Sequence, residues 1–264
     1  MRAALLPLVN FETFEAAPAA LLRARGNATA RLLARADWVL RRKRDGRYLA
    51  ATSAGRVHVL LPDDWRSALQ RQAPEDVLRR LYRCDDRGEV PTLPLSGVHG
   101  MLSRLGIAPG YGEARQLAPV PEPTRLVFAG YDRYRRPLWL TAAAATAWLA
   151  MQHAAARGGV VLEAISGYRS HAYQLGIFRR KLAREVALDA ILAVNAAPGY
   201  SEHHSGRALD IGTPGEAAAE DSFEATPAFA WLGSHAAGFG FVLSYPRGNP
   251  HGINFEPWHW CLRS

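Results

Sequence analysis

The residues best suited to chemistry lie after position 165, in three short segments. One of them, SEHHSGRALDI at 201–211, places His203 and His204 shortly before Asp210. Histidine nitrogens and carboxylate oxygens are typical ligands of catalytic zinc, which keeps a further position open for water. The run 207–211 is typical of a strand, and Gly206 allows the preceding loop to fold back toward Asp210. Alone, this spacing is more typical of a polar loop in which the histidines are exposed and the aspartate caps a turn.

The C-terminal segment NFEPWHWCLRS favours the metal interpretation. It holds Glu256 and His259 three positions apart in an aromatic setting. Read alone, it suggests a tryptophan-rich edge strand with a buried, hydrogen-bonded histidine. Combined with the 201–211 segment, it offers a third metal ligand and a carboxylate that can act as a general base.

The third segment, SGYRSHAYQ at 166–174, places Arg169 at the start of a predicted helix that carries Gln174. A guanidinium there can stabilise the oxyanion formed when water attacks a carbonyl, or hold a substrate carboxylate. An arginine in a basic protein is more often a solvated surface group. Its functional interpretation therefore depends on the two other segments.

The elements that must position these residues follow from the patterns around them. We expect a strand over 124–132, a helix over 140–159 that ends in a glycine pair, and a strand entering a loop over 160–170. A second helical stretch is expected over 172–194. Beyond it the chain alternates short strands with loops rich in glycine and proline.

The first part of the chain has a different organisation. Residues 13–35 have helix-like spacing of alanine, leucine and arginine, interrupted by Pro18 and a second break near residue 26. Residues 38–52 predict two strands around a tight turn at Asp45 and Gly46, followed by a short strand over 57–62. Residues 63–83 predict a helix.

Three prolines within LAPVPEPT make 118–124 the best linker candidate. We therefore expect an N-terminal α+β region over 1–117, whose role the sequence does not indicate, and a second domain over 125–264.

The composition is that of a globular protein with a basic surface. The net charge is +8, yet no nucleic-acid-binding motif accompanies it, so we expect no nucleic-acid partner. Cys84 and Cys261 are too few for a disulfide framework. No apolar run is long enough for a membrane span, and the opening MRAALLPLV is at most a minimal signal-peptide core, so we expect no cleaved signal.

In their order along the chain, the three segments resemble the signatures of VanY-type D-alanyl-D-alanine carboxypeptidases. This family lies in a wider group with lysostaphin-type metallopeptidases and the hedgehog signalling domain. The resemblance covers about residues 125–262 and selects His203 rather than His204 as the ligand. The S-x-H-x-x-G-x-A-x-D pattern is matched at Ser201, His203, Gly206, Ala208 and Asp210.

The resemblance implies an α+β fold in which a small antiparallel sheet is flanked by helices and carries zinc in a groove. It implies one zinc ion bound by His203, Asp210 and His259. Glu256 would activate the bound water, and Arg169 would polarise the scissile carbonyl and contact the substrate. Gln174 and Ser201 would help to hold the end of the peptide.

The implied reaction is removal of the terminal D-alanine from peptidoglycan stem peptides or muropeptides, by a protein expected to be a monomer. An L,D-carboxypeptidase or an endopeptidase on cross-links could use the same zinc site. A different class is also open, that of a non-catalytic, zinc-containing module that binds the cell wall or a protein. The inferred substrate favours the periplasm or cell envelope, whereas the missing signal also allows a cytoplasmic location.

Overall fold

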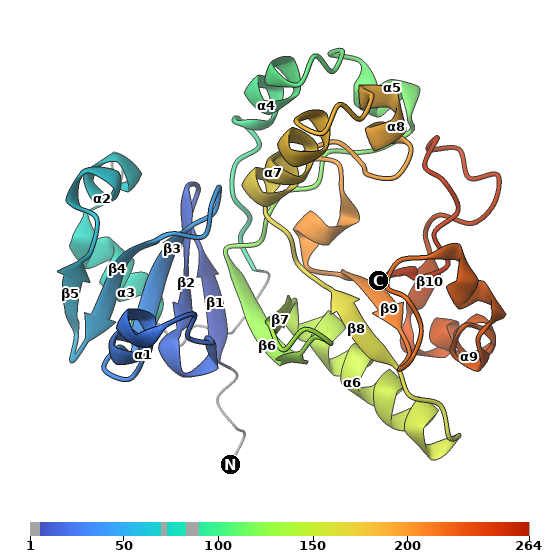
Figure 1. Ribbon diagram of the computed structural model, residues 1–264, viewed down its shortest axis with the longest axis horizontal. Helices are drawn as coiled ribbons and strands as arrows, with labels where there is room; N and C mark the ends of the chain where they lie inside the picture. Colours follow the sequence, from blue (N-terminus) through green and yellow to red (C-terminus); the bar gives the residue numbers. More distant parts are fainter. Residues whose placement is uncertain (1–5, 70–72, 83–89, 264) are drawn as a thin grey trace.

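The computed structural model describes residues 6–69, 73–82 and 90–263. These residues form two antiparallel sheets with helices packed around them, shown in Figure 1. The expected α+β class is confirmed.

The larger sheet has seven strands in the order β5-β4-β3-β2-β1-β6-β7. Asp45 and Gly46 lie in the connection between β3 and β4, where the sequence predicts the tight turn, and Gly46 has a positive φ of 71°. The strands are β1 Pro7–Asn10, β2 Phe14–Pro18, β3 Trp38–Arg42, β4 Tyr48–Ser53, β5 Arg56–Val59, β6 Arg125–Tyr131 and β7 Pro137–Leu140.

The helical expectation for residues 13–35 is wrong for its first part. Phe14–Pro18 is strand β2, and every residue in it is buried between β1 and β3. Pairing on both edges overrides the weak strand preference of alanine. Helical structure follows only later, in the short 3-10 helix η1 Ala19–Leu21 and in helix α1 Asn27–Leu33.

Two helices cover the outer part of this sheet, where a single helix was expected over 63–83. They are α2 Pro62–Ala68 and α3 Pro74–Tyr82, with residues 70–72 outside the described part of the chain. Trp65 of α2 and Val77 of α3 pack against Phe14 and Leu40 of the sheet. This cluster is the hydrophobic core of the N-terminal region.

The smaller sheet has the order β10-β11-β9-β8 and lies beyond the long helix α6, Ala142–Arg157. Thr141 caps this helix by accepting a hydrogen bond from the Ala144 N–H at 3.3 Å. Trp148 and Met151 of α6 pack with Leu209 and Trp260 of the smaller sheet. The elements here are β8 Glu163–Ser166, β9 Ala208–Gly212, β10 Phe241–Leu243, β11 His259–Leu262, the helix α9 Pro227–His235, and the 3-10 helices η2 Glu202–Ser205, η3 Asp221–Ala225 and η4 Ala236–Phe239.

A group of short helices gathers at the top of the view in Figure 1. Its shared core includes Val98, Leu102 and Phe178. The stretch expected as one helix over 172–194 is two helices in the structure, and Glu185 has a positive φ of 60° in the break between them. The helices are α4 Val98–Arg104, α5 Tyr111–Ala114, α7 His171–Leu182 and α8 Leu188–Leu192.

The two sides of segment 118–124 are closely joined. Strand β1 pairs with β6, with Leu8 opposite Leu126, so the larger sheet contains strands from both sides. Helices α4 and α5 precede the segment and share a core cluster with α7 and α8, which follow it. The division of the chain into domains at 118–124 stays a prediction.

Two further expectations concern the whole chain. Among the described residues, no helix is long and apolar enough to cross a membrane. Cys261 is buried and free, whereas Cys84 lies outside the described residues.

Candidate active site

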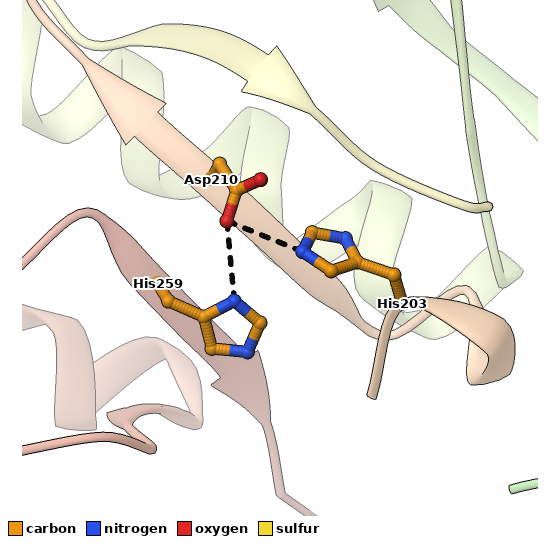
Figure 2. A group of neighbouring side chains, drawn as sticks. All are labelled: His203, Asp210 and His259. Carbon is orange, nitrogen blue, oxygen red and sulfur yellow. Dashed lines mark hydrogen bonds and ion pairs between the residues drawn. The ribbon is translucent and has the colours of Figure 1, made fainter. Parts of the chain in front are cut away.

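Three side chains of the smaller sheet and its preceding turn converge on one point. Asp210 of β9 is paired directly with His259 of β11, and His203 lies in η2 just before β9. In Figure 2 both imidazole rings face the Asp210 carboxylate. Its Oδ1 atom lies 3.2 Å from His203 Nε2 and 3.1 Å from His259 Nδ1.

Gly206 makes the turn that brings His203 back to the strand. It ends η2 in the left-handed conformation, with φ 67°. A Cβ atom there would overlap the side chain of Leu126 in β6. The glycine therefore allows both the turn and its close packing against the larger sheet.

Each histidine has one nitrogen engaged away from the centre, which leaves the other free to bind a metal. His203 Nδ1–H donates to the Gly167 carbonyl at 2.7 Å, so Nε2 carries the lone pair. The Nε2 of His259 lies 3.0 Å from the Glu202 carboxylate, which leaves Nδ1 toward Asp210. Metal-binding histidines characteristically use their second nitrogen in this way.

The three side chains are almost fully buried, and their surroundings shift their pKa values in different directions. Burial and the charge of Arg169 lower the pKa of His203 to about 4. Burial also opposes a charge on His259, yet its hydrogen bonds with Asp210 and Glu202 outweigh this and raise its pKa to about 10. Burial raises the pKa of Asp210, but the two histidines and Arg169 hold it well below its ordinary value.

The three side chains fit a divalent metal. Their ligand atoms all lie within 4.8 Å of one another. Two nitrogens and one carboxylate oxygen form a donor set that suits zinc and leaves a fourth position for water. The structure therefore brings together the predicted ligands His203, Asp210 and His259. Their role as ligands stays a prediction.

Glu256 lies beside this cluster. Its Oε2 atom is 3.9 Å from His259 Nδ1, the nitrogen that faces the centre, and its backbone N–H donates to the Tyr245 carbonyl at 3.1 Å. Burial raises the pKa of Glu256 to about 7, although the nearby His259 opposes the rise. A carboxylate with a pKa near neutrality is suited to accept and return a proton.

Arg169 contacts the second oxygen of the Asp210 carboxylate, the one that does not face the two histidines. One of its Nη atoms lies 3.4 Å from Asp210 Oδ2, while its buried Nε has no partner among the described residues. Its backbone N–H donates to the His203 carbonyl at 3.2 Å. The side chain is therefore held next to the predicted ligands, and its Nε–H is available for a further hydrogen bond.

Gln174 and Ser201 line the same pocket as Arg169, Glu256 and His259, whose empty space is about 280 Å³ including the part open to solvent. Gln174 Nε2 donates to the Ala196 carbonyl at 2.9 Å, whereas its buried Oε1 has no partner in the described part of the chain. Both residues therefore lie on the wall of the pocket that the predicted ligands His203 and His259 also line. Their contact with substrate stays a prediction.

Two residues have roles that the sequence patterns did not reveal. Glu202 contacts His259 across 57 positions of sequence, and its other oxygen accepts a hydrogen bond from Arg263 at 2.5 Å. His204 is fully buried, and its Nδ1–H donates to the Arg169 carbonyl at 2.6 Å. Neither contact has a sequence signal, because each depends on how distant segments meet.

Comparison with known proteins finds a family model that matches the part of the chain carrying this site. Residues 137–263 match the family model described as VanY, D-alanyl-D-alanine carboxypeptidase. This segment contains all the predicted site residues, and the match confirms the resemblance that the three motifs indicate.

Individual proteins are similar over the same part of the chain. The YodJ protein of Bacillus subtilis (strain 168) is 37% identical over 120 residues, covering 44% of this chain and 43% of YodJ. A D-alanyl-D-alanine carboxypeptidase of Enterococcus faecium is 32% identical over 133 residues, covering 49% of this chain and 39% of that protein. The matched parts therefore span about two fifths of these relatives.

Among solved structures, the LD-carboxypeptidase LdcB is 31% identical, with a TM-score of 0.49, and the match covers 53% of this chain and 69% of that one.

Proposed function

We propose that the VanY-type segment of this chain is a zinc-dependent carboxypeptidase that removes the terminal D-alanine from peptidoglycan stem peptides. One observation carries the proposal. Arg169, His203, Glu256 and His259 line one pocket, and Asp210 contacts both of these histidines, although the residues come from segments up to 90 positions apart, counting from 169 to 259.

The residues divide the reaction between them. Zinc bound by His203, Asp210 and His259 would lower the pKa of a water molecule and so supply the nucleophile. Glu256 would accept the proton from this water and pass it to the leaving amine, a task for which its place beside His259 suits it. The Arg169 guanidinium would stabilise negative charge on the carbonyl oxygen as water attacks.

The pocket also suits a small terminal residue of a peptide substrate. Gln174 and Ser201 lie on its wall, and the buried Gln174 Oε1 can accept a hydrogen bond from a substrate N–H. The empty space of about 280 Å³, which includes the part open to solvent, can hold a residue the size of alanine. We therefore favour release of a single terminal residue over cleavage within a cross-link.

A defined pentapeptide ending in D-Ala-D-Ala tests the proposal. The zinc-loaded protein should release one alanine, detected by mass spectrometry of the products, and Glu256→Gln should lose nearly all of this activity. Glu220→Gln, a change of the same type at an exposed position, is the matched control and should retain it.

The alternative functions predict other results with the same protein. Release of alanine from a tetrapeptide, with the pentapeptide intact, would identify an L,D-carboxypeptidase. Cleavage of cross-linked dimers alone would identify an endopeptidase. A protein that binds zinc and peptidoglycan but leaves all three substrates intact would be a non-catalytic binding module, and the proposal would be wrong.

A further inference from the structure

A buried ion pair links the N-terminal region to the segment that carries Arg169. Lys43 directly follows strand β3, and Glu122 lies in the proline-rich segment 118–124. Lys43 Nζ lies 2.5 Å from Glu122 Oε2, and the two side chains are 0% and 5% exposed. Both residues lie outside the family match at 137–263, so the resemblance assigns them no role.

The Glu122 carboxylate accepts hydrogen bonds from the chain on both sides of Arg169. Its Oε2 atom accepts a hydrogen bond from the hydroxyl of Tyr168, the residue before Arg169. Its Oε1 atom accepts one from the backbone N–H of His171 at 2.9 Å. Because His171 is the first residue of α7, the carboxylate also lies at a helix end that favours negative charge.

The backbone of Arg169 is held from the other side by the turn that carries the metal ligand. Its N–H donates to His203, and its carbonyl accepts from His204. The His204 ring in turn packs edge-on against that of His171, with centroids 4.4 Å apart. Two sets of contacts therefore fix the backbone position of Arg169. One comes from His203 and His204, and the other comes from Glu122, which is paired with Lys43 of the N-terminal region.

Lys43 stabilises the charged form of the buried Glu122 carboxylate. Burial disfavours the ionised form of Glu122, but the attraction and hydrogen bond of Lys43, together with His171 and the hydroxyl of Tyr168, hold its pKa below the ordinary value. Without the lysine, the carboxylate would be a buried charge without its cation. It would then take up a proton or move toward water, and either change alters its hydrogen bonds to Tyr168 and His171.

We propose that Lys43 is a positioning residue of this site. Through Glu122 it holds the turn 168–171 and thereby aims the Arg169 guanidinium into the pocket. The N-terminal region thus completes the site of the VanY-type segment. The catalytic part of this inference rests on the function proposed above, whereas the positioning of the turn does not.

Amide hydrogen exchange of the full-length, zinc-loaded protein tests the positioning directly. In Lys43→Met, exchange in the segment containing 168–171 should rise about tenfold or more, because the His171 N–H loses a well-placed acceptor. The segment containing 259–262 should keep its wild-type exchange. Unchanged exchange at 168–171 in a folded Lys43→Met protein would overturn the proposal.

The neighbouring residue provides a matched control. Arg42 is the last residue of β3, directly before Lys43, and its guanidinium pairs with Asp45 and Asp64 instead of Glu122. Arg42→Met also removes a buried cation from the same region, yet it should leave exchange at 168–171 unchanged. Equal effects of the two substitutions would show general loosening of the sheet and would also overturn the proposal.

Kinetics on the D-Ala-D-Ala pentapeptide test the catalytic consequence. Lys43→Met should lower kcat by about tenfold or more, with a smaller change in KM and unchanged zinc affinity, because Arg169 is misplaced by a small distance. An unchanged kcat would overturn this part. If the wild-type protein leaves the pentapeptide intact, the proposed function fails, while the exchange experiment still decides the role of Lys43.

Tyr168→Phe covers the case in which Lys43→Met does not fold. It keeps the ion pair and the aromatic ring but removes the hydroxyl that donates to Glu122. Its kcat should fall in the same direction at a wild-type unfolding temperature. A wild-type kcat and wild-type exchange at 168–171 in Tyr168→Phe would count against the proposal.

Discussion

The Glu202 carboxylate lies 3.0 Å from Nε2 of His259, while Nδ1 of the same ring lies 3.1 Å from Asp210. His259 is thus held between two carboxylates, one in the predicted metal centre and one behind it. This arrangement fixes the ring orientation and keeps Nδ1 toward the centre. It leads to a prediction for a residue that no motif singled out.

Glu202→Gln should weaken zinc binding by about 10- to 100-fold, because loss of an outer carboxylate makes the histidine a poorer and less oriented ligand. Competition with a chromophoric chelator measures the affinity. Glu224→Gln is the control, since Glu224 also pairs with an arginine but lies exposed, away from the site. Equal affinities of Glu202→Gln and the wild type would exclude the orienting role.

Removal of zinc should abolish peptide cleavage, and added zinc should restore it. Zinc should also raise the unfolding temperature, because it binds the folded site, and at 100 times its Kd the stabilisation is about 2.7 kcal/mol. His203→Ala should lose this thermal shift and His153→Ala, outside the site, should keep it. Cleavage that persists in thoroughly metal-free protein would contradict the metal mechanism.

The stability of the metal-free protein should depend on Glu256 in a defined direction. Its pKa is raised from 4.5 to about 7 by burial, so the folded state binds a proton more tightly than the unfolded state. The resulting contribution to stability is present below pH 4.5 and is lost as the pH rises through about 7.

Glu256→Gln removes this dependence. At pH 8 the metal-free variant should be more stable than the wild type by up to about 3 kcal/mol, because it lacks the buried charge. Near pH 4 the two should be similar. Urea unfolding at both pH values measures the difference, and a variant that is less stable at pH 8 would refute this account of Glu256.

Activity should fall as the solution becomes acidic. Protonated Glu256 cannot accept a proton from water, and protonation of His203 or His259, the predicted ligands, would release the metal. The pH dependence of kcat at saturating zinc measures this. A rate that rises toward low pH would contradict the assignment of Glu256 as the base.

Arg169→Met should lower kcat/KM by about 10²- to 10³-fold, the usual cost of losing one group that stabilises the oxyanion. Zinc affinity should change much less, because the three ligands remain. Arg179→Met is a matched control on the exposed side of helix α7. A loss confined to zinc affinity would show that Arg169 acts only on Asp210, with which it forms an ion pair.

Much of the organisation could be predicted from local patterns. Asp45 and Gly46 specify a tight turn between two strands, and the alanine-rich run before Gly158 specifies helix α6, because these preferences depend on near neighbours. Phe14–Pro18 was mispredicted for the opposite reason. Its alanines suit a helix, and only pairing with β1 and β3 makes it a strand.

The candidate site also has some features that follow from local sequence and others that depend on tertiary contacts. The sequence by itself determined the chemical types and the order of Arg169, His203, Asp210, Glu256 and His259, because ligand and base chemistry belongs to the side chains. Only the tertiary structure decided which nitrogen of each histidine faces the centre. It also decided that Glu202 lies behind His259 and that Lys43 reaches the turn of Arg169 through Glu122. Such contacts join residues far apart in the chain, and their geometry exists only once the two sheets and the intervening segment have packed together.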